Sequence, residues 1–196
     1  MGAVRASYDL LTWWAVVALG ILVTACAGSS PYMRRVETLQ QPQPDKALVR
    51  FLRPSGMGAL INFNVLDGEK VIGNSVAKSQ FSYLAEPGHH LFVATAENKA
   101  FLEADLEAGK TYYVVTRIYP GAWTARVAFV PVTRGSELWY EALEYEKSLH
   151  ILEPQADEIA RWEKQNADKI RAVLHQYKFE WKEAYQWPVL RPEDGR

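Results

Sequence analysis

The residue whose position most restricts the chemistry of this chain is Cys26, the only cysteine among the 196 residues. It follows an apolar run from Leu10 to Ala25 and stands directly after Val23-Thr24-Ala25, an aliphatic residue and two small ones. At about 1.5 Å per helical residue this run reaches roughly 24 Å, which is shorter than the ~30 Å hydrocarbon core of a bilayer. The pattern therefore predicts a removable signal peptide over residues 1–25.

The tetrapeptide Val23-Thr24-Ala25-Cys26 resembles the lipobox of bacterial lipoproteins. The resemblance implies a mature chain that begins at Cys26 and is held to a membrane by two acyl chains. Two chains suit stable anchoring, because one chain alone binds a membrane only marginally. Gly28 is not the aspartate that retains many lipoproteins in the inner membrane, so the resemblance implies a cell-envelope location with the outer membrane favoured. An uncleaved signal anchor and a non-acylated signal peptide with an incidental cysteine remain as alternatives.

The other residues that carry chemistry form no catalytic or metal-binding pattern. His89 and His90 are adjacent in a predicted strand, where side chains point to opposite faces and cannot bind one metal together. Two carboxylate pairs have the right chemistry for glycan hydrolysis, although solvent-facing charges explain them more simply: Glu103 with Asp105, and Glu141 with Glu144. We therefore expect no catalytic residue, no metal site and no cofactor.

Aromatic residues gather near the C-terminus and suggest a contact surface. Trp139 and Tyr140 are adjacent in a predicted helix and cannot both face the core, so one of these two residues is the candidate for an exposed partner contact. Other aromatic residues recur at helical spacing and are expected to lie mostly in the core: Trp162, Tyr177, Trp181 and Tyr185.

Composition narrows the class of partner. The net charge is −1, which leaves no basic excess for nucleic acid, and 48% of the residues are hydrophobic, enough for a core without disulfides. About 170 residues would remain after cleavage, the size of one domain with an appendage. We expect the membrane to be contacted through the N-terminal lipid.

The pattern along the chain predicts a mainly β fold with a C-terminal α-helical extension. Residues 26–45 are rich in Ser, Pro and Gln and are expected to form a lipidated N-terminus and a flexible or extended linker. Residues 46–133 contain short alternating runs separated by turns such as Asp67-Gly68, which predict a seven- to eight-stranded antiparallel β-sandwich. The predicted strands span residues 46–53, 59–65, 70–73, 80–84, 89–95, 101–106, 112–119 and 124–132.

Residues 134–187 have helical spacing. Two helices are predicted, from Ser136 to Leu149 and from Gln155 to about Gln186, separated by Glu153-Pro154. Residues 188–196 are expected to be a polar, mobile tail.

Three segments between about Ala47 and Val132 resemble a bacterial lipoprotein family that has a β-sandwich domain of unknown function, similar in style to PEGA domains. These segments are 47–55, 86–90 and 106–114, the last of which is expected to be a strand, a glycine-containing hairpin turn and an aromatic strand. The resemblance implies the fold and an envelope location, and it supplies no catalytic residues.

These observations favour a membrane-anchored, non-enzymatic binding or interaction module whose partner is an envelope protein or a cell-wall glycan. A pilotin-like assembly factor is the main alternative and would show an exposed apolar groove between the helices and the sheet. A periplasmic hydrolase is a weaker alternative, which would need a polar cluster in a cleft.

Overall fold

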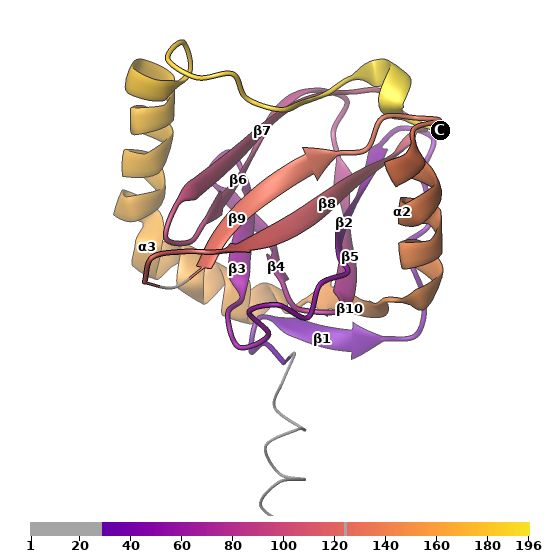
Figure 1. The fold of residues 1–196 in the computed structure, drawn as a ribbon, viewed down its shortest axis with the longest axis horizontal. Coiled ribbons are helices and arrows are strands. Elements are labelled where there is room, and N and C mark those ends of the chain that lie inside the picture. The colour runs from indigo at the N-terminus through magenta and orange to yellow at the C-terminus, as the bar shows by residue number, and fades with distance from the viewer. Residues whose placement is uncertain (1–28, 124) are drawn as a thin grey trace, which may run out of the picture.

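Two β-sheets pack against each other, and a helix covers the outer face of each (Figure 1). The computed structural model describes residues 29–123 and 125–196. Sheet A has the strand order β1-β10-β5-β2-β8-β9, and sheet B has the order β11-β7-β6-β3-β4. The strands are β1 (Met33–Val36), β2 (Ala47–Arg53), β3 (Phe63–Asp67), β4 (Lys70–Ser75), β5 (Ser79–Ala85), β6 (Gly88–Thr95), β7 (Lys99–Leu106), β8 (Thr111–Pro120), β9 (Ala125–Pro131), β10 (His150–Pro154) and β11 (Val189–Leu190). The predicted mainly β fold with a C-terminal helical extension is confirmed.

The sheets differ in detail from the predicted antiparallel sandwich of seven to eight strands. The described residues form eleven strands, and both sheets are mixed. Three neighbouring pairs are parallel, namely β2 with β8, β10 with β5, and β11 with β7. Because β7 and β8 belong to different sheets, residues 107–110 connect the two sheets and the hairpin predicted over residues 106–114 is wrong.

The core between the sheets is built from the alternating residues of the central strands. Phe51 of β2 stacks on Phe81 with ring centres 5.0 Å apart and meets Phe92 edge-on at 5.2 Å. Gly73 lies against the same cluster, where an added Cβ would stand 2.6 Å from the Phe81 ring. A side chain at this position would therefore collide with the central aromatic stack.

Helix α2 (Glu137–Ser148) covers the outer face of sheet A. Its first turn begins as predicted at Ser136, whose side chain accepts a hydrogen bond from the backbone N–H of Trp139. The Trp139 ring meets the Tyr113 ring edge-on at 5.6 Å. The central strands of sheet A beneath α2 are consequently buried on both faces, which explains why every residue of β2 is buried.

Helix α3 (Ala156–Gln176) covers sheet B and is shorter than predicted. It passes into the π-helical turn η1 (Tyr177–Trp181), where the Lys182 N–H bonds to the Tyr177 carbonyl. The Trp181 carbonyl then accepts hydrogen bonds from the backbone N–H of Tyr185 and from the Trp187 indole, and this bonding ends the helix.

The predicted linker and the predicted mobile tail each contain a short segment that pairs with a sheet. Met33 is buried, and β1 pairs with β10, so part of the segment expected to be a flexible or extended linker is a strand, while residues 37–45 are mostly exposed and outside the sheets. At the other end, Leu190 is buried in β11, while Arg196 and Thr111 exchange two backbone hydrogen bonds. Exposed sheet edges offer unpaired backbone groups, and these short segments satisfy them. A final 3₁₀ turn, η2, spans Pro192–Asp194.

Candidate functional site: an apolar cavity beneath α3

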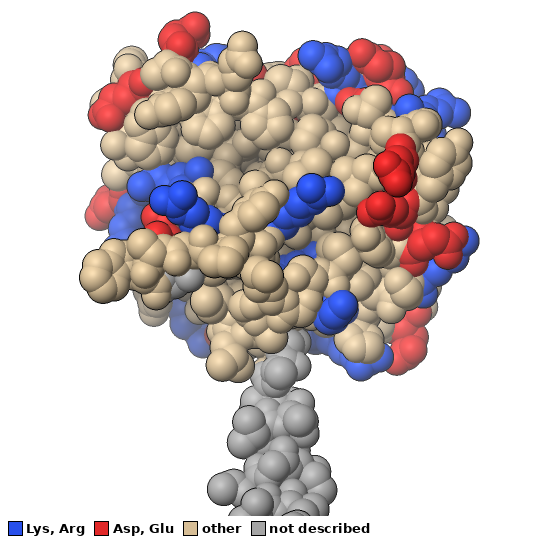
Figure 2. Space-filling view, in the orientation of Figure 1, with Lys and Arg blue, Asp and Glu red and all other residues tan. Residues whose placement is uncertain are grey.

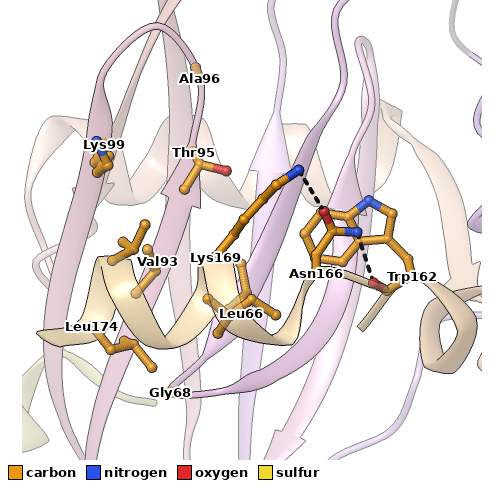
Figure 3. A pocket seen from close by; sticks show the side chains of 12 residues that line it. Leu66, Gly68, Val93, Thr95, Ala96, Lys99, Trp162, Asn166, Lys169 and Leu174 are labelled. Carbon is orange, nitrogen blue, oxygen red and sulfur yellow. Dashed lines mark hydrogen bonds between the residues drawn. The ribbon is translucent and has the colours of Figure 1, made fainter. Parts of the chain in front are cut away.

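A cavity of about 220 Å³ lies between α3 and the outer face of sheet B (Figure 3). Leu66 of β3 and Val93 of β6 form its floor, and α3 supplies aliphatic side chains and one indole from above. The lining from α3 includes Trp162, Ile170, Val173 and Leu174. A cavity of this size can hold an aromatic or branched aliphatic group, since an engineered apolar cavity of ~150 Å³ binds benzene.

The spacing of apolar residues in α3 explains where the cavity forms. Ile159 and Ile170 are buried against sheet B, with Trp162 and Val173 packed beside them. The Glu163 carboxylate also accepts a hydrogen bond from the backbone N–H of Val71, which joins α3 to the edge strand β4. The helix is therefore fixed at the sheet edge, and the cavity lies alongside this attachment.

Polar groups stand at one side of the cavity. The Lys169 ammonium donates to the Asn166 side-chain oxygen at 3.4 Å, and the Asn166 amide donates to the Trp162 carbonyl at 2.9 Å (Figure 3). Lys99 lies on the β7 side, with its ammonium 5.2 Å from the centre of the Trp181 ring. An apolar interior flanked by two cations fits an apolar group that has a polar or anionic end, and the lining contains no carboxylate.

His89 and His90 lie apart from this cavity, and each contacts a different aspartate. His89 pairs with Asp105 at 2.9 Å on the surface, whereas Nδ1 of the largely buried His90 lies 2.7 Å from Asp67. The hydrogen bond with Asp67 raises the pKa of His90 above its ordinary value. Tyr83 donates to the same Asp67 oxygen at 3.0 Å, and burial raises the pKa of this phenol. These contacts join strands from the two sheets and supply no open site.

The carboxylates considered as acid–base pairs each have a separate partner. Glu103 accepts a hydrogen bond from the Tyr177 hydroxyl at 2.6 Å, and this bond lowers the pKa of Glu103. Glu141 accepts from Tyr145, and Glu144 pairs with Lys147. In the described part of the chain, no group of three or more His, Cys, Asp or Glu side chains could hold a metal ion.

Of the two adjacent aromatic residues considered for a partner contact, one faces the core and the other faces solvent, as expected. Trp139 is buried beneath α2, whereas Tyr140 is 65% exposed. Of the aromatic residues expected in the helical core, Tyr177 is buried, Trp162 and Trp181 are half-buried, and Tyr185 is exposed.

The predicted lipidation site Cys26 and the lipobox residues Val23, Thr24 and Ala25 lie outside the described residues. Within residues 29–123 and 125–196, no helix is both long and apolar enough to cross a bilayer.

Sequence reasoning missed the cavity and its two lysines. The apolar face of α3 was visible as helical spacing, but Lys99 and Lys169 are 70 positions apart by residue number and no local motif connects them. The chain matches no protein-family model, no curated protein and no solved structure.

Proposed function

We propose that this chain is a lipid-anchored protein of the bacterial cell envelope that acts as a non-enzymatic binding module, and that its cavity beneath α3 receives an apolar side chain of a protein partner. The cavity between α3 and sheet B is the observation that carries the proposal. The lipobox-like sequence ending at Cys26 supports the anchor.

The lining favours a protein partner over a cell-wall glycan. A sugar presents several hydroxyl groups, and burying them without hydrogen-bond partners is unfavourable. The polar lining groups are few, and Asn166 already bonds within its own helix. An aromatic or aliphatic side chain has no such requirement and would also bury the exposed part of Trp162.

A pilotin-like assembly factor is the second candidate, and the same cavity favours it. Such a protein needs an apolar groove between helix and sheet to hold a segment of the envelope protein that it escorts. A hydrolase is less well supported, because the carboxylates discussed above are engaged in separate contacts.

The test is crosslinking in cells of the full-length chain with a photoreactive residue at position 169, beside the cavity. We expect one dominant envelope partner in the wild-type background. Val173→Trp, which fills the cavity, should abolish the adduct, whereas Ala172→Trp on the exposed side of the same helix should retain it. An adduct that survives Val173→Trp would refute the cavity as the binding site.

The anchor is tested separately by Cys26→Ala. This variant should lose the lipid mass and leave the membrane fraction. Retention of both by Cys26→Ala would refute the lipoprotein interpretation.

A further inference from the structure

Large apolar side chains project into solvent from two neighbouring turns. Met57 is 53% exposed and Leu60 is 85% exposed on the loop of residues 54–62, and Trp123 is 92% exposed at the tip of the β8–β9 hairpin. The loop packs against the part of β8 that leads into this hairpin, since a Cβ added at Gly58 would stand 3.5 Å from the Ile118 side chain. Apolar groups gathered in this way indicate a contact surface.

Both turns are held in place by buried or partly buried charged side chains. Arg53 donates to the Ile61 carbonyl at 2.8 Å and to the Gly58 carbonyl at 2.9 Å. Glu97 accepts hydrogen bonds from the backbone N–H groups of Ala122 and Trp123, each at 2.9 Å. The backbone that carries Met57, Leu60 and Trp123 is therefore restrained by hydrogen bonds, which lowers the entropy lost on contact.

This surface lies where the described chain begins. The Asn62 side-chain amide donates to the Ser29 carbonyl at 2.9 Å, which places Ser29 beside the loop. Cys26 is three residues earlier, and an extended chain spans at most ~3.3–3.6 Å per residue, so the two residues are separated by no more than about 11 Å. If Cys26 is acylated, the loop must lie close to the bilayer that holds the lipid.

The charges around the surface suit an anionic membrane. Lys78 approaches the loop, since a Cβ at Gly56 would stand 3.5 Å from its Cε, and the Arg126 side chain on β9 is 61% exposed, although its Nε lies 3.9 Å from the Glu97 carboxylate. On the face shown in Figure 2, uncharged and basic side chains predominate around the point at which the described chain begins. Basic side chains near a bilayer are attracted to anionic headgroups, and tryptophan favours the interface.

We infer that the loop of residues 54–62 and the tip of the β8–β9 hairpin form a membrane-contacting face, which places Met57, Leu60 and Trp123 in the interfacial region of the bilayer that carries the lipid anchor. This inference rests on the proposed acylation of Cys26. It adds an orientation, because the domain lies directly on the membrane rather than at the end of a long spacer.

The test uses the full-length acylated chain reconstituted into vesicles of phosphatidylethanolamine and phosphatidylglycerol. Acylation blocks the natural thiol, so Leu60→Cys provides a unique position for an environment-sensitive fluorophore. Ala108→Cys is the matched control, because it is exposed on the connection that precedes β8, at the opposite end of this strand from the hairpin. We expect brominated lipids to quench the label at position 60 at least several-fold more strongly than the label at position 108.

The outcomes separate the inference from the anchor. Equal quenching at the two positions, in protein that carries the lipid mass and floats with the vesicles, would overturn the membrane-contacting face alone. Protein that lacks the lipid mass would overturn the anchor and this inference with it. A response at position 60 that follows protein concentration without vesicles would assign the surface to a second copy of the chain and overturn the inference.

Discussion

Arg50 of β2 and Glu146 of α2 form a buried ion pair, with Nε and Oε1 2.6 Å apart. The other Glu146 oxygen accepts hydrogen bonds from the Tyr113 hydroxyl at 3.0 Å and from the Arg196 guanidinium at 3.1 Å. Arg50 also donates to Ser82 of β5 at 2.9 Å. One carboxylate therefore joins two central strands, helix α2 and the last residue of the chain.

Replacing Glu146 by Gln should lower the free energy of unfolding by about 3–5 kcal/mol, because Arg50 would remain buried without its counter-charge. Removing both charges, as Arg50→Met with Glu146→Leu, should recover most of this loss. Urea denaturation of the single and double variants measures the difference. If the double variant is as unstable as the single one, the uncompensated charge is not the cause.

His90 should make stability depend on pH. Its Nδ1 faces Asp67, and its Nε2 lies 2.8 Å from the Glu86 carbonyl, so the protonated ring satisfies two acceptors. The folded-state pKa is raised, chiefly by the hydrogen bond with Asp67. This contribution is complete below the ordinary pKa of about 6.5 and is lost as the pH rises through the higher folded-state value.

We therefore expect the free energy of unfolding to fall as the pH rises above about 6.5, and His90→Gln should flatten this part of the profile. Urea denaturation across the range checks the slope. His89→Gln, which changes the neighbouring exposed histidine, is the control and should retain the wild-type profile. A wild-type slope in His90→Gln would show that another group titrates.

The strands were predictable because their signal is local. Ala47, Val49 and Phe51 alternate with residues of the other face, and the inter-sheet core contains all three. Ser136 was likewise recognisable as a helix start, since its side chain caps the backbone three residues later. In both cases a few adjacent residues contain the physical cause.

The assignment of strands to sheets and the candidate site depend on distant contacts. β10 and β11 form only because sheet edges are available, and neither short segment shows an alternating pattern of its own. Arg53 looks like a solvent-facing charge at a strand end, yet it is buried against carbonyl groups that carry no sequence signature. Lys99 and Lys169 are brought to one cavity only by the packing of α3 on sheet B.

Gly73→Ala should destabilise the fold by about 1–3 kcal/mol, because the new Cβ would stand 2.6 Å from the Phe81 ring. Adding Phe81→Leu should relieve this clash, so the double variant should be more stable than the sum of the two single effects. Thermal or urea denaturation provides the measurement. Gly56→Ala is the control, since its Cβ would meet Lys78 at an ordinary 3.5 Å; equal losses in the two alanine variants would refute the clash.

Lys169→Glu should weaken binding of the anionic probe anilinonaphthalene sulfonate by about two- to five-fold, the scale of an exposed charge interaction. The neutral probe N-phenylnaphthylamine should bind unchanged, because the apolar lining is retained. Fluorescence titration of both probes gives the comparison. Lys164→Glu places the same charge at an exposed position of α3 outside this cavity. An equal effect at positions 164 and 169 would indicate bulk charge rather than the cavity.

Arg53→Met should release the loop that carries Met57 and Leu60. The Arg53 guanidinium also bonds to the Ser75 carbonyl at 2.9 Å, and burial lowers its pKa to about 10, which still leaves it charged at neutral pH. Each acceptor left buried without a donor costs about 1–3 kcal/mol, so the loop should open to hydrate its carbonyls. Hydrogen exchange of residues 57–62 should accelerate at least ten-fold, while the central strand β2 remains protected.

Arg53→Lys is the informative control for this prediction. A lysine keeps the charge, but its single ammonium cannot reproduce the planar fork that joins the carbonyls of the loop to that of Ser75. We expect the loop of Arg53→Lys to exchange almost as fast as that of Arg53→Met. Wild-type protection in the lysine variant would mean that charge alone orders the loop. Because the loop positions Leu60, faster exchange should be accompanied by weaker quenching of a label at position 60 by brominated lipids.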